Sequence, residues 1–301
     1  MRVRRWWVGR TVESMRRSGR LGLAELMSAV EAALGLGNVS PMGSGGQKIV
    51  ATADFGGQSA IVKIVLIPPG PNGLMALERA HREVELLAAV DSSAVVRVLT
   101  DAVEIGDAPD AICWVEERLD GDDLDHHLSV RWDEADVWTL AEDLAVALEA
   151  CHEQEVVHRD LSPRNIRCLP TGRYVVMDPG LARHLARAAL TGLLQPGSFG
   201  WMSPEHVPGG RAIPASDVFS VGVLLYCALT AELPVPYAHD DADYYRRLAH
   251  DQAPSIRAER PDISDELVRL VDQCLNRQAA RRFLDGQELL DAVRSMRGGI
   301  L

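Results

Sequence analysis

The chain has 301 residues, 47% of them hydrophobic, which is enough apolar material for one large core or for two lobes. Its formal net charge of −12 argues against general affinity for nucleic acid. No apolar run approaches the roughly 18 residues of a membrane-spanning helix, and the five cysteines are scattered without paired spacing. These features exclude a membrane span and favour reduced thiols in a cytoplasmic protein over a disulfide or zinc framework.

The first 20 residues are strongly basic, with seven arginines against one acid, Glu13, and with Trp6 and Trp7 among them. Leucine and valine then recur at three- and four-residue steps over residues 21–36, which predicts an amphipathic helix. One interpretation of residues 1–40 is an arm that contacts a membrane surface or a partner. The other, which we prefer, is a helix packed on the neighbouring domain, preceded by a disordered tail or a misassigned start.

A glycine-rich segment precedes a strand that carries a lone lysine. Glycines such as Gly43 and Gly45 let backbone N–H groups approach phosphates, although glycine-rich turns are common. The apolar run at residues 60–65 predicts a strand and contains Lys63. Only Lys48 and Lys63 among the 31 basic residues are lysines. A charge inside an apolar strand needs a partner of opposite charge, so the sequence predicts an acidic residue close to Lys63.

The next predicted helix offers that acid. Residues 74–90 have helical periodicity, with small and aliphatic side chains along one stripe and Glu83 near its middle. A solvated glutamate fits poorly at the centre of a buried face. The sequence therefore predicts an ion pair between Lys63 and Glu83.

A strand and a long helix then lead to a polar stretch. Residues 111–119 predict a strand that runs into a connector at Asp120-Gly121, and residues 134–155 predict an apolar-periodic helix. The polar stretch, residues 158–165, reads His-Arg-Asp-Leu-Ser-Pro-Arg-Asn. Its aspartate, Asp160, can receive a proton from a hydroxyl group.

Asp178-Pro-Gly follows this stretch, and the residues between predict a short β-hairpin with a turn at 170–173. The centre of that hairpin falls between Thr171 and Gly172, so Asn165 and Asp178 are expected to be cross-strand neighbours. Two oxygen ligands at the open end of a hairpin can hold one divalent cation.

Together these motifs resemble the catalytic and metal-binding loops of protein kinases, above all the eukaryotic-type Ser/Thr kinases of bacteria. The resemblance covers about residues 41–296. Residues 197–205 resemble the substrate-docking loop with its Pro-Glu ending, and residues 217–230 an apolar helix of the family. Arg282 matches a late arginine that pairs with Glu205 in kinases. Small-molecule kinases, the alternative phosphotransferases, generally lack this pairing.

The resemblance implies an α+β fold with two lobes. Residues 41–118 would form the N-lobe, a small antiparallel sheet with one main helix, and residues 119–298 a larger, mainly helical C-lobe. It also implies transfer of the γ-phosphoryl group of ATP, with Mg²⁺ or Mn²⁺, to serine or threonine hydroxyls of a protein whose identity the sequence leaves open.

The resemblance assigns a role to each candidate residue. Asp160 would orient the attacking hydroxyl, and Asn165 and Asp178 would hold the metal. Lys63, fixed by Glu83, would grip the α- and β-phosphates. The residues expected around the nucleotide are Gly43, Gly45, Val50, Ile61, Lys63, Glu117, Leu119 and Arg167.

Several positions depart from the family pattern. Ser162 stands where Ser/Thr kinases carry a lysine, and Arg164 is the only cationic side chain between Asp160 and Asn165 that can supply the charge. Pro179 replaces the phenylalanine of Asp-Phe-Gly. These changes leave open a pseudokinase that acts as a nucleotide-binding or protein-interaction module.

The adenine site also differs from the family pattern. Ile61 takes the place of a small residue above the base, and Arg167 that of an apolar residue below it, where its guanidinium could stack on the ring. Glu116 falls at the entrance of the hinge between the lobes.

Thr191, 13 residues after Asp178, is a candidate phosphorylation site. The other hydroxyls of the segment, Ser198 and Ser203, have structural duties in the family, and Arg159 can receive a phosphate. The alternative is a segment that is ordered without modification.

Overall fold

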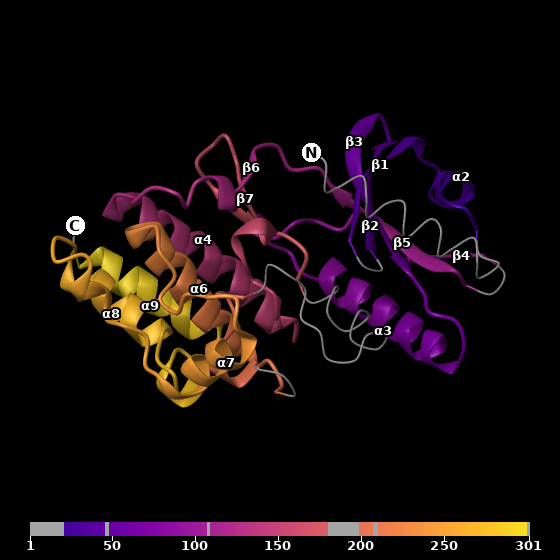
Figure 1. Ribbon diagram of the computed structural model, residues 1–301. Coiled ribbons are helices and arrows are strands. Elements are labelled where there is room, and N and C mark those ends of the chain that lie inside the picture. Colours follow the sequence, from indigo (N-terminus) through magenta and orange to yellow (C-terminus); the bar gives the residue numbers. More distant parts are fainter. Residues whose placement is uncertain (1–20, 46–47, 107–108, 180–198, 207–209, 300–301) are drawn as a thin grey trace. The chain divides into compact units, whose positions relative to one another are not determined.

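The computed structural model describes residues 21–45, 48–106, 109–179, 199–206 and 210–299 (Figure 1). These residues form two compact units. The first contains residues 21–89 and 97–118, and the second contains residues 90–96 and those from Leu119 onward. A sheet with one main helix and a mainly helical second unit together confirm the expected α+β fold.

The first unit is built on an antiparallel sheet in the order β1-β2-β3-β5-β4. Its strands are β1 (Gly37–Gly45), β2 (Lys48–Phe55), β3 (Gln58–Leu66), β4 (Val103–Ile105) and β5 (Ala111–Glu117). Strands β2 and β3 are joined by the two-residue turn Gly56-Gly57, and both glycines have positive φ angles, 60° and 82°. Paired positive φ angles match the right-handed twist of the flanking strands, which explains why glycine occupies both positions.

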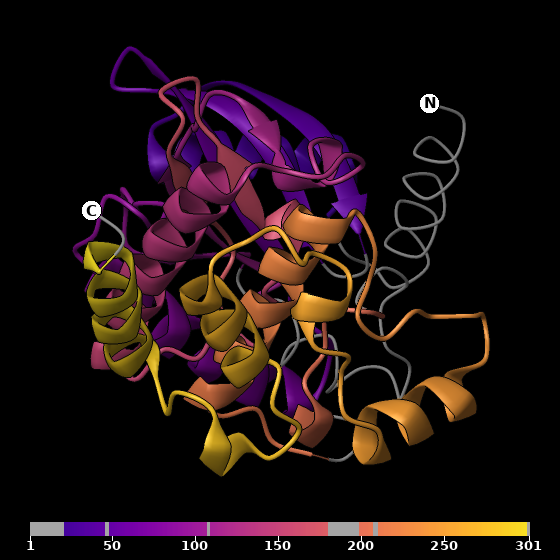
Figure 2. The same cartoon turned by 90° about the vertical axis from the view of Figure 1, so that its left-hand side faces the viewer.

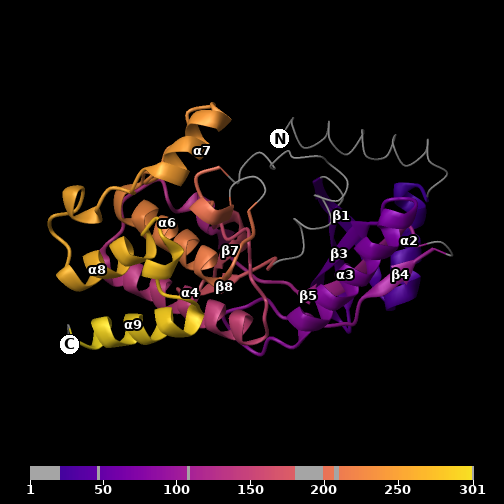
Figure 3. The same ribbon diagram turned by 90° about the horizontal axis from the view of Figure 1, so that it is seen from below.

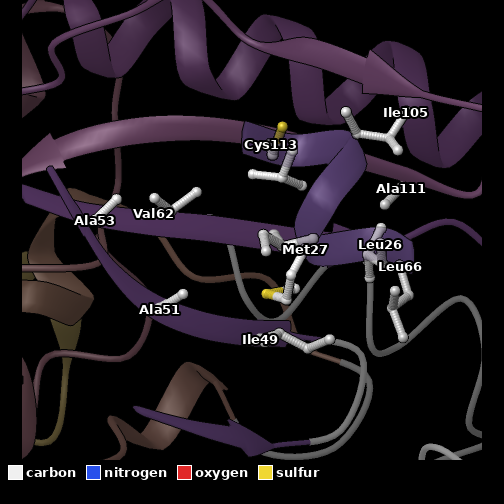
Figure 4. Packing of buried hydrophobic residues seen from close by; sticks show 12 residues of the cluster. Leu26, Met27, Ile49, Ala51, Ala53, Val62, Leu66, Ile105, Ala111 and Cys113 are labelled. Atoms are coloured by element: carbon white, nitrogen blue, oxygen red, sulfur yellow. The ribbon is translucent and has the colours of Figure 1, made fainter. Parts of the chain in front are cut away.

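Helix α2 (Leu23–Leu34) covers one face of this sheet (Figure 4). Leu26, Met27 and Val30 of α2 are buried against alternate residues of β3 such as Val62 and Ile64. The helix predicted over residues 21–36 is therefore present and packs on the sheet. The basic arm, residues 1–20, lies outside the described residues.

The second helix of this unit, α3 (Pro71–Ala88), begins three residues before the predicted start because Pro71 occupies its first turn, where its missing N–H is harmless. The predicted buried stripe is confirmed, since Ala76, Ala80 and Leu87 are almost fully buried. Glu83 lies half-buried on α3.

Helices α4 (Glu134–Glu153), α6 (Pro214–Thr230), α8 (Asp265–Cys274) and α9 (Gly286–Gly298) make up most of the second unit. Helix α9, the yellow helix at the left of Figure 2, lies beside α4, and α6 contacts both α4 and α8. Every residue of α6 from Ala215 to Thr230 is buried, including the polar residues Ser216, Asp217, Ser220 and Thr230 within this otherwise mainly apolar helix. None of the helices in the described ranges is long and apolar enough to cross a membrane.

A small sheet in the order β6-β7-β8 lies beside α4 (Figure 3). Its strands are β6 (Asp122–Asp123), β7 (Ile166–Cys168) and β8 (Tyr174–Val176). The remaining elements of the second unit are α7 (Asp241–His250) and the 3₁₀ turns η1 (Leu124–His126), η2 (Pro163–Asn165), η3 (Pro204–His206), η4 (Ile256–Ala258) and η5 (Ala279–Arg281).

An ion pair between Glu205 and Arg282 joins η3 to the end of η5, as the resemblance implies. Nη1 of Arg282 lies 2.7 Å from one carboxylate oxygen of Glu205, and Nη2 lies 2.9 Å from the other. The fully buried guanidinium also donates to the carbonyls of Ala215, Asn276 and Arg277. All five donors of an arginine are suited to this planar arrangement, which a lysine could not reproduce.

Burial alone would raise the pKa of Glu205, but the hydrogen bonds and charge of Arg282 outweigh it and lower that pKa. A carboxyl whose pKa is lowered by folding adds stability above its unfolded-state pKa and loses it as the pH falls through the folded-state pKa. We expect Glu205→Gln to lower the free energy of unfolding by about 3 kcal/mol at pH 7, because a buried charge loses its partner. The deficit should shrink as the pH falls below the ordinary pKa range of glutamate.

Urea denaturation across this pH range would measure the effect. Glu266→Gln is the matched control, because Glu266 pairs with Arg269 at 2.7 Å on the surface of α8. That variant should unfold nearly as the wild type does. Equal stability of Glu205→Gln and wild type at pH 7 would show that the buried pair is energetically neutral.

Candidate active site

Lys63 lies on the sheet face opposite α2, because its neighbours Val62 and Ile64 point into the α2 core. Its Nζ lies 3.5 Å from Oε2 of Glu116, in β5. The other oxygen of Glu116, Oε1, accepts a 2.8 Å hydrogen bond from Nε1 of Trp114. Lys63 therefore has an acidic partner, as its place in an apolar strand requires. This partner is Glu116, which we had expected only at the entrance of the hinge.

The register of the sheet could have revealed this pair. Lys63 stands directly opposite Trp114, so Glu116, two residues along β5, is a diagonal neighbour on the same face. The pair between Lys63 and Glu83 stays a prediction.

Three of the expected nucleotide residues occupy one line across the sheet. Gly43 of β1 pairs with Val50 of β2, and Val50 pairs with Lys63 of β3. Ile61 lies two residues before Lys63 and therefore on the same face. Gly43 in the glycine-rich strand therefore lies in the same cross-strand row as Lys63, which carries the ammonium group.

Glu117 ends β5, and its contacts lie within the first unit. Its N–H donates to the carbonyl of Arg97 at 2.9 Å, and its carboxylate accepts the N–H of Arg97 at 2.9 Å. The roles of Glu117 and Leu119 at the adenine edge stay predictions.

In the second unit, Asp217 of α6 holds the polar stretch that contains Asp160. Its Oδ2 accepts the backbone N–H of His158 at 2.7 Å, and its Oδ1 accepts the N–H of Arg159 at 2.9 Å. Arg159 has a φ of 66°, an unfavourable value for a residue with a side chain. Two hydrogen bonds to one buried carboxylate stabilise this conformation and so orient the following Asp160.

His152 of α4 completes the network around Asp217. Its Nδ1 accepts the backbone N–H of Gly286 at 2.9 Å. The proton of a neutral ring therefore lies on Nε2, which donates to Oδ2 of Asp217 at 3.1 Å. Our sequence reasoning found neither this role of His152 nor that of Asp217, because the partners are far apart in the chain.

The β7–β8 hairpin is confirmed, but its register is not the predicted one. Leu169 and Arg173 pair across a three-residue loop, Pro170 to Gly172, with Gly172 at a φ of 79°. Because this loop has an odd number of residues and ends on a glycine in the left-handed conformation, the hairpin is centred on Thr171. Asn165 consequently faces Met177, whose N–H donates to the Asn165 carbonyl at 2.8 Å. The prediction that Asn165 and Asp178 are direct cross-strand neighbours was wrong by one residue.

Both candidate metal ligands nevertheless lie at the open end of this hairpin. Nδ2 of Asn165 donates to the carbonyl of Asp160 at 2.8 Å, which leaves Oδ1 as the atom able to bind a cation. Asp178 follows β8 and has a φ of 56°. Nε2 of His158 lies 3.0 Å from the carbonyl of Met177 and so connects the Asp160 stretch to the strand before Asp178.

A buried carboxylate on α4 anchors the other end of the hairpin. Asp143 accepts the N–H of Tyr174 and two 2.9 Å bonds from Nε of Arg173, and it also contacts Nη2. The turn that spaces the two candidate metal ligands is therefore attached to the helical core.

The two unusual arginines have acidic neighbours within the second unit. Arg164 is 68% exposed, and its Nε lies 3.4 Å from Oδ2 of Asp125. Nη1 of Arg167 donates to the carbonyl of Gly121 at 3.0 Å and lies 3.2 Å from Oδ1 of Asp123. Their roles toward a phosphate and a base stay predictions.

The described part of the docking segment is tied to α6 and α7. The N–H of Gly200 donates to the Tyr244 hydroxyl at 2.9 Å, and the Ser220 hydroxyl donates to the carbonyl of Trp201 at 2.8 Å. Thr191 and Ser198 lie outside the described residues.

Comparison with known proteins agrees with this arrangement. The model of the protein kinase domain family matches residues 38–291. The serine/threonine-protein kinase pkn2 of Myxococcus xanthus is 30% identical over 84% of this chain, and a probable serine/threonine-protein kinase PknB of Lactococcus lactis is 26% identical over 85%. The chain spans 31% and 41% of the length of these two relatives.

Solved structures show the same fold. The PknI kinase domain of Mycobacterium tuberculosis has a TM-score of 0.62 at 20% identity, with 87% of this chain and 97% of that chain covered. A structure of Rad53 in complex with AMP-PNP has a TM-score of 0.66 at 20% identity, with 85% and 64% covered. Since the family model extends from the first strand of the sheet into the last helix, the chain belongs to the protein kinase family.

Proposed function

We propose that this chain transfers the γ-phosphoryl group of ATP to serine or threonine hydroxyls of proteins. The observation that carries the proposal is the way Asp217 and Asn165 hold the stretch around Asp160. Asp160 would orient the hydroxyl and receive its proton, while Lys63 would bind the α- and β-phosphates. The relatives are named as protein kinases, and neither the pseudokinase nor the small-molecule kinase is favoured by them.

The residues at the hairpin's open end suit Mg²⁺ or Mn²⁺. A carboxylate from Asp178 and an amide oxygen from Asn165 are hard oxygen ligands of the kind these ions prefer. The described residues contain no group of three or more His, Cys, Asp or Glu able to hold a metal. A cation there would therefore complete its coordination with phosphate oxygens and water, and when bound it would neutralise charge on the phosphates.

The thiols support the expected location in a reducing compartment such as the cytoplasm. All five cysteines are free. Burial raises the pKa values of Cys113, Cys151, Cys227 and Cys274 to about 12, so these thiols stay protonated and unreactive at neutral pH.

We expect Asp160→Asn to slow phosphoryl transfer by about 10²–10⁴, because it removes the proton acceptor. Asp178→Ala should abolish metal-dependent nucleotide binding. Transfer from labelled ATP to a mixed panel of serine and threonine peptides would measure the first effect, and calorimetry with and without Mg²⁺ the second. Asp291→Asn, an exposed change on α9, is the control. Transfer by Asp160→Asn at the wild-type rate would refute the role of Asp160, and a wild type without transfer would refute the enzymatic proposal.

We also expect Arg164→Ala to lower kcat more than it raises KM for ATP. The positive charge of Arg164 would interact with the transferred phosphoryl group mainly in the transition state. Steady-state kinetics would separate the two constants. Asp125→Asn tests the competing explanation that Arg164 only pairs with Asp125. An equal loss of kcat in both variants, or no loss in Arg164→Ala, would exclude a role of Arg164 in the reaction.

Thr191 remains our candidate for regulation by phosphorylation. Mass spectrometry after incubation with ATP should find phosphate on Thr191, and Thr191→Ala should slow transfer to an added peptide. A phosphate carries about −1.5 to −2 charges and would form charge-assisted bonds to arginine. An active preparation without phosphate on Thr191 contradicts this prediction.

A further inference from the structure

The pair between Lys63 and Glu116 is unusual because both charges are buried. Their side chains are 8% and 2% exposed. A buried carboxylate is costly unless its oxygens are satisfied, and both oxygens of Glu116 are used, one by Trp114 and one by Lys63. Since the indole of Trp114 is itself fully buried, it fixes the direction in which Glu116 points.

The 3.5 Å separation describes an ion pair without a short hydrogen bond. Charge-assisted bonds from nitrogen to oxygen are normally about 2.7–2.9 Å long. The bond from Trp114 to Glu116, at 2.8 Å, is the tighter of the two contacts. The carboxylate is therefore the fixed member of the pair, and the ammonium, on its flexible stem, is the member that can move.

Glu116 also lies among the residues expected around the nucleotide. It stands directly opposite Ile61 in the sheet, on the same face as Lys63 and Val50. A carboxylate in this place offers the Lys63 ammonium the same kind of partner that a phosphate would.

We propose that Glu116 is a positioning residue that competes with the phosphates of the nucleotide for Lys63 and thereby sets the affinity of the chain for nucleotides. This rests on the proposed role of Lys63. Nucleotide phosphates draw the ammonium away from a carboxylate that stays fixed by Trp114. Binding is therefore weaker than it would be with a neutral residue at this position, and the penalty grows with the number of phosphates on the ligand.

The test is Glu116→Gln, which keeps an oxygen for the Trp114 bond and removes only the charge. Removing the negative charge that lies beside the Lys63 ammonium should tighten binding of ATP about tenfold. The gain should be smaller for ADP, and adenosine, which carries no phosphate, should bind as it does to the wild type. Calorimetry with each ligand, in the presence of Mg²⁺, would give the three dissociation constants.

Two further variants isolate the cause. Glu104→Gln removes an exposed carboxylate from β4 of the same sheet, where it pairs with His81, and should leave all three constants unchanged. In a Lys63→Met background, Glu116→Gln should no longer tighten ATP binding, because the contested ammonium is absent.

The outcomes separate this inference from the proposed function. A wild-type chain that binds no ATP would refute both. ATP binding by the wild type, with equal or weaker binding by a folded Glu116→Gln, would overturn the inference alone. A gain that is equal for adenosine and ATP would also overturn it, since it would mean that Glu116 shapes the base site.

Discussion

The carboxylate of Asp217 is the interaction on which the proposed active site depends most. It is almost fully buried and receives hydrogen bonds from two backbone N–H groups and one imidazole. These three donors point at the carboxylate and stabilise its charge. The N–H groups of His158 and Arg159 both bind this one acceptor, which helps to stabilise the left-handed backbone at Arg159. The direction of Asp160 is thus determined by the helical core of the second unit as much as by its own loop.

Four buried or half-buried carboxylates divide into two kinds according to whether they accept backbone N–H groups from other segments. Asp217 and Asp143 bind backbone N–H groups and so hold segments of chain, and Asp143 also binds the Arg173 guanidinium. Glu205 and Glu116 face side-chain cations. Glu205 binds Arg282 through two short hydrogen bonds, which suits a permanent connection. Glu116 faces the Lys63 ammonium at a longer distance, which suits a contact that is exchanged.

The helices, the hairpin and the pairing of Glu205 with Arg282 could be predicted from the sequence, because periodicity and motif spacing are local or carried by the family resemblance. What could not be predicted depends on register. A change of one residue in the length of the turn changes the cross-strand partner of Asn165 from Asp178 to Met177. The length of the turn is decided by Gly172 rather than by the motif. Glu116 was missed as a partner of Lys63 because diagonal contacts require a known strand alignment.

Helix α2 has a consequence for where the folding unit begins. The family model starts at residue 38, but Leu26, Met27 and Val30 already fill the apolar face of the sheet. A chain cut at the family boundary would present that face, including Ile49, Val62 and Ile64, to water. Contiguous apolar surface of this kind promotes aggregation. The limit of sequence similarity is therefore not the limit of the cooperative structure, and expression of the domain should begin before α2.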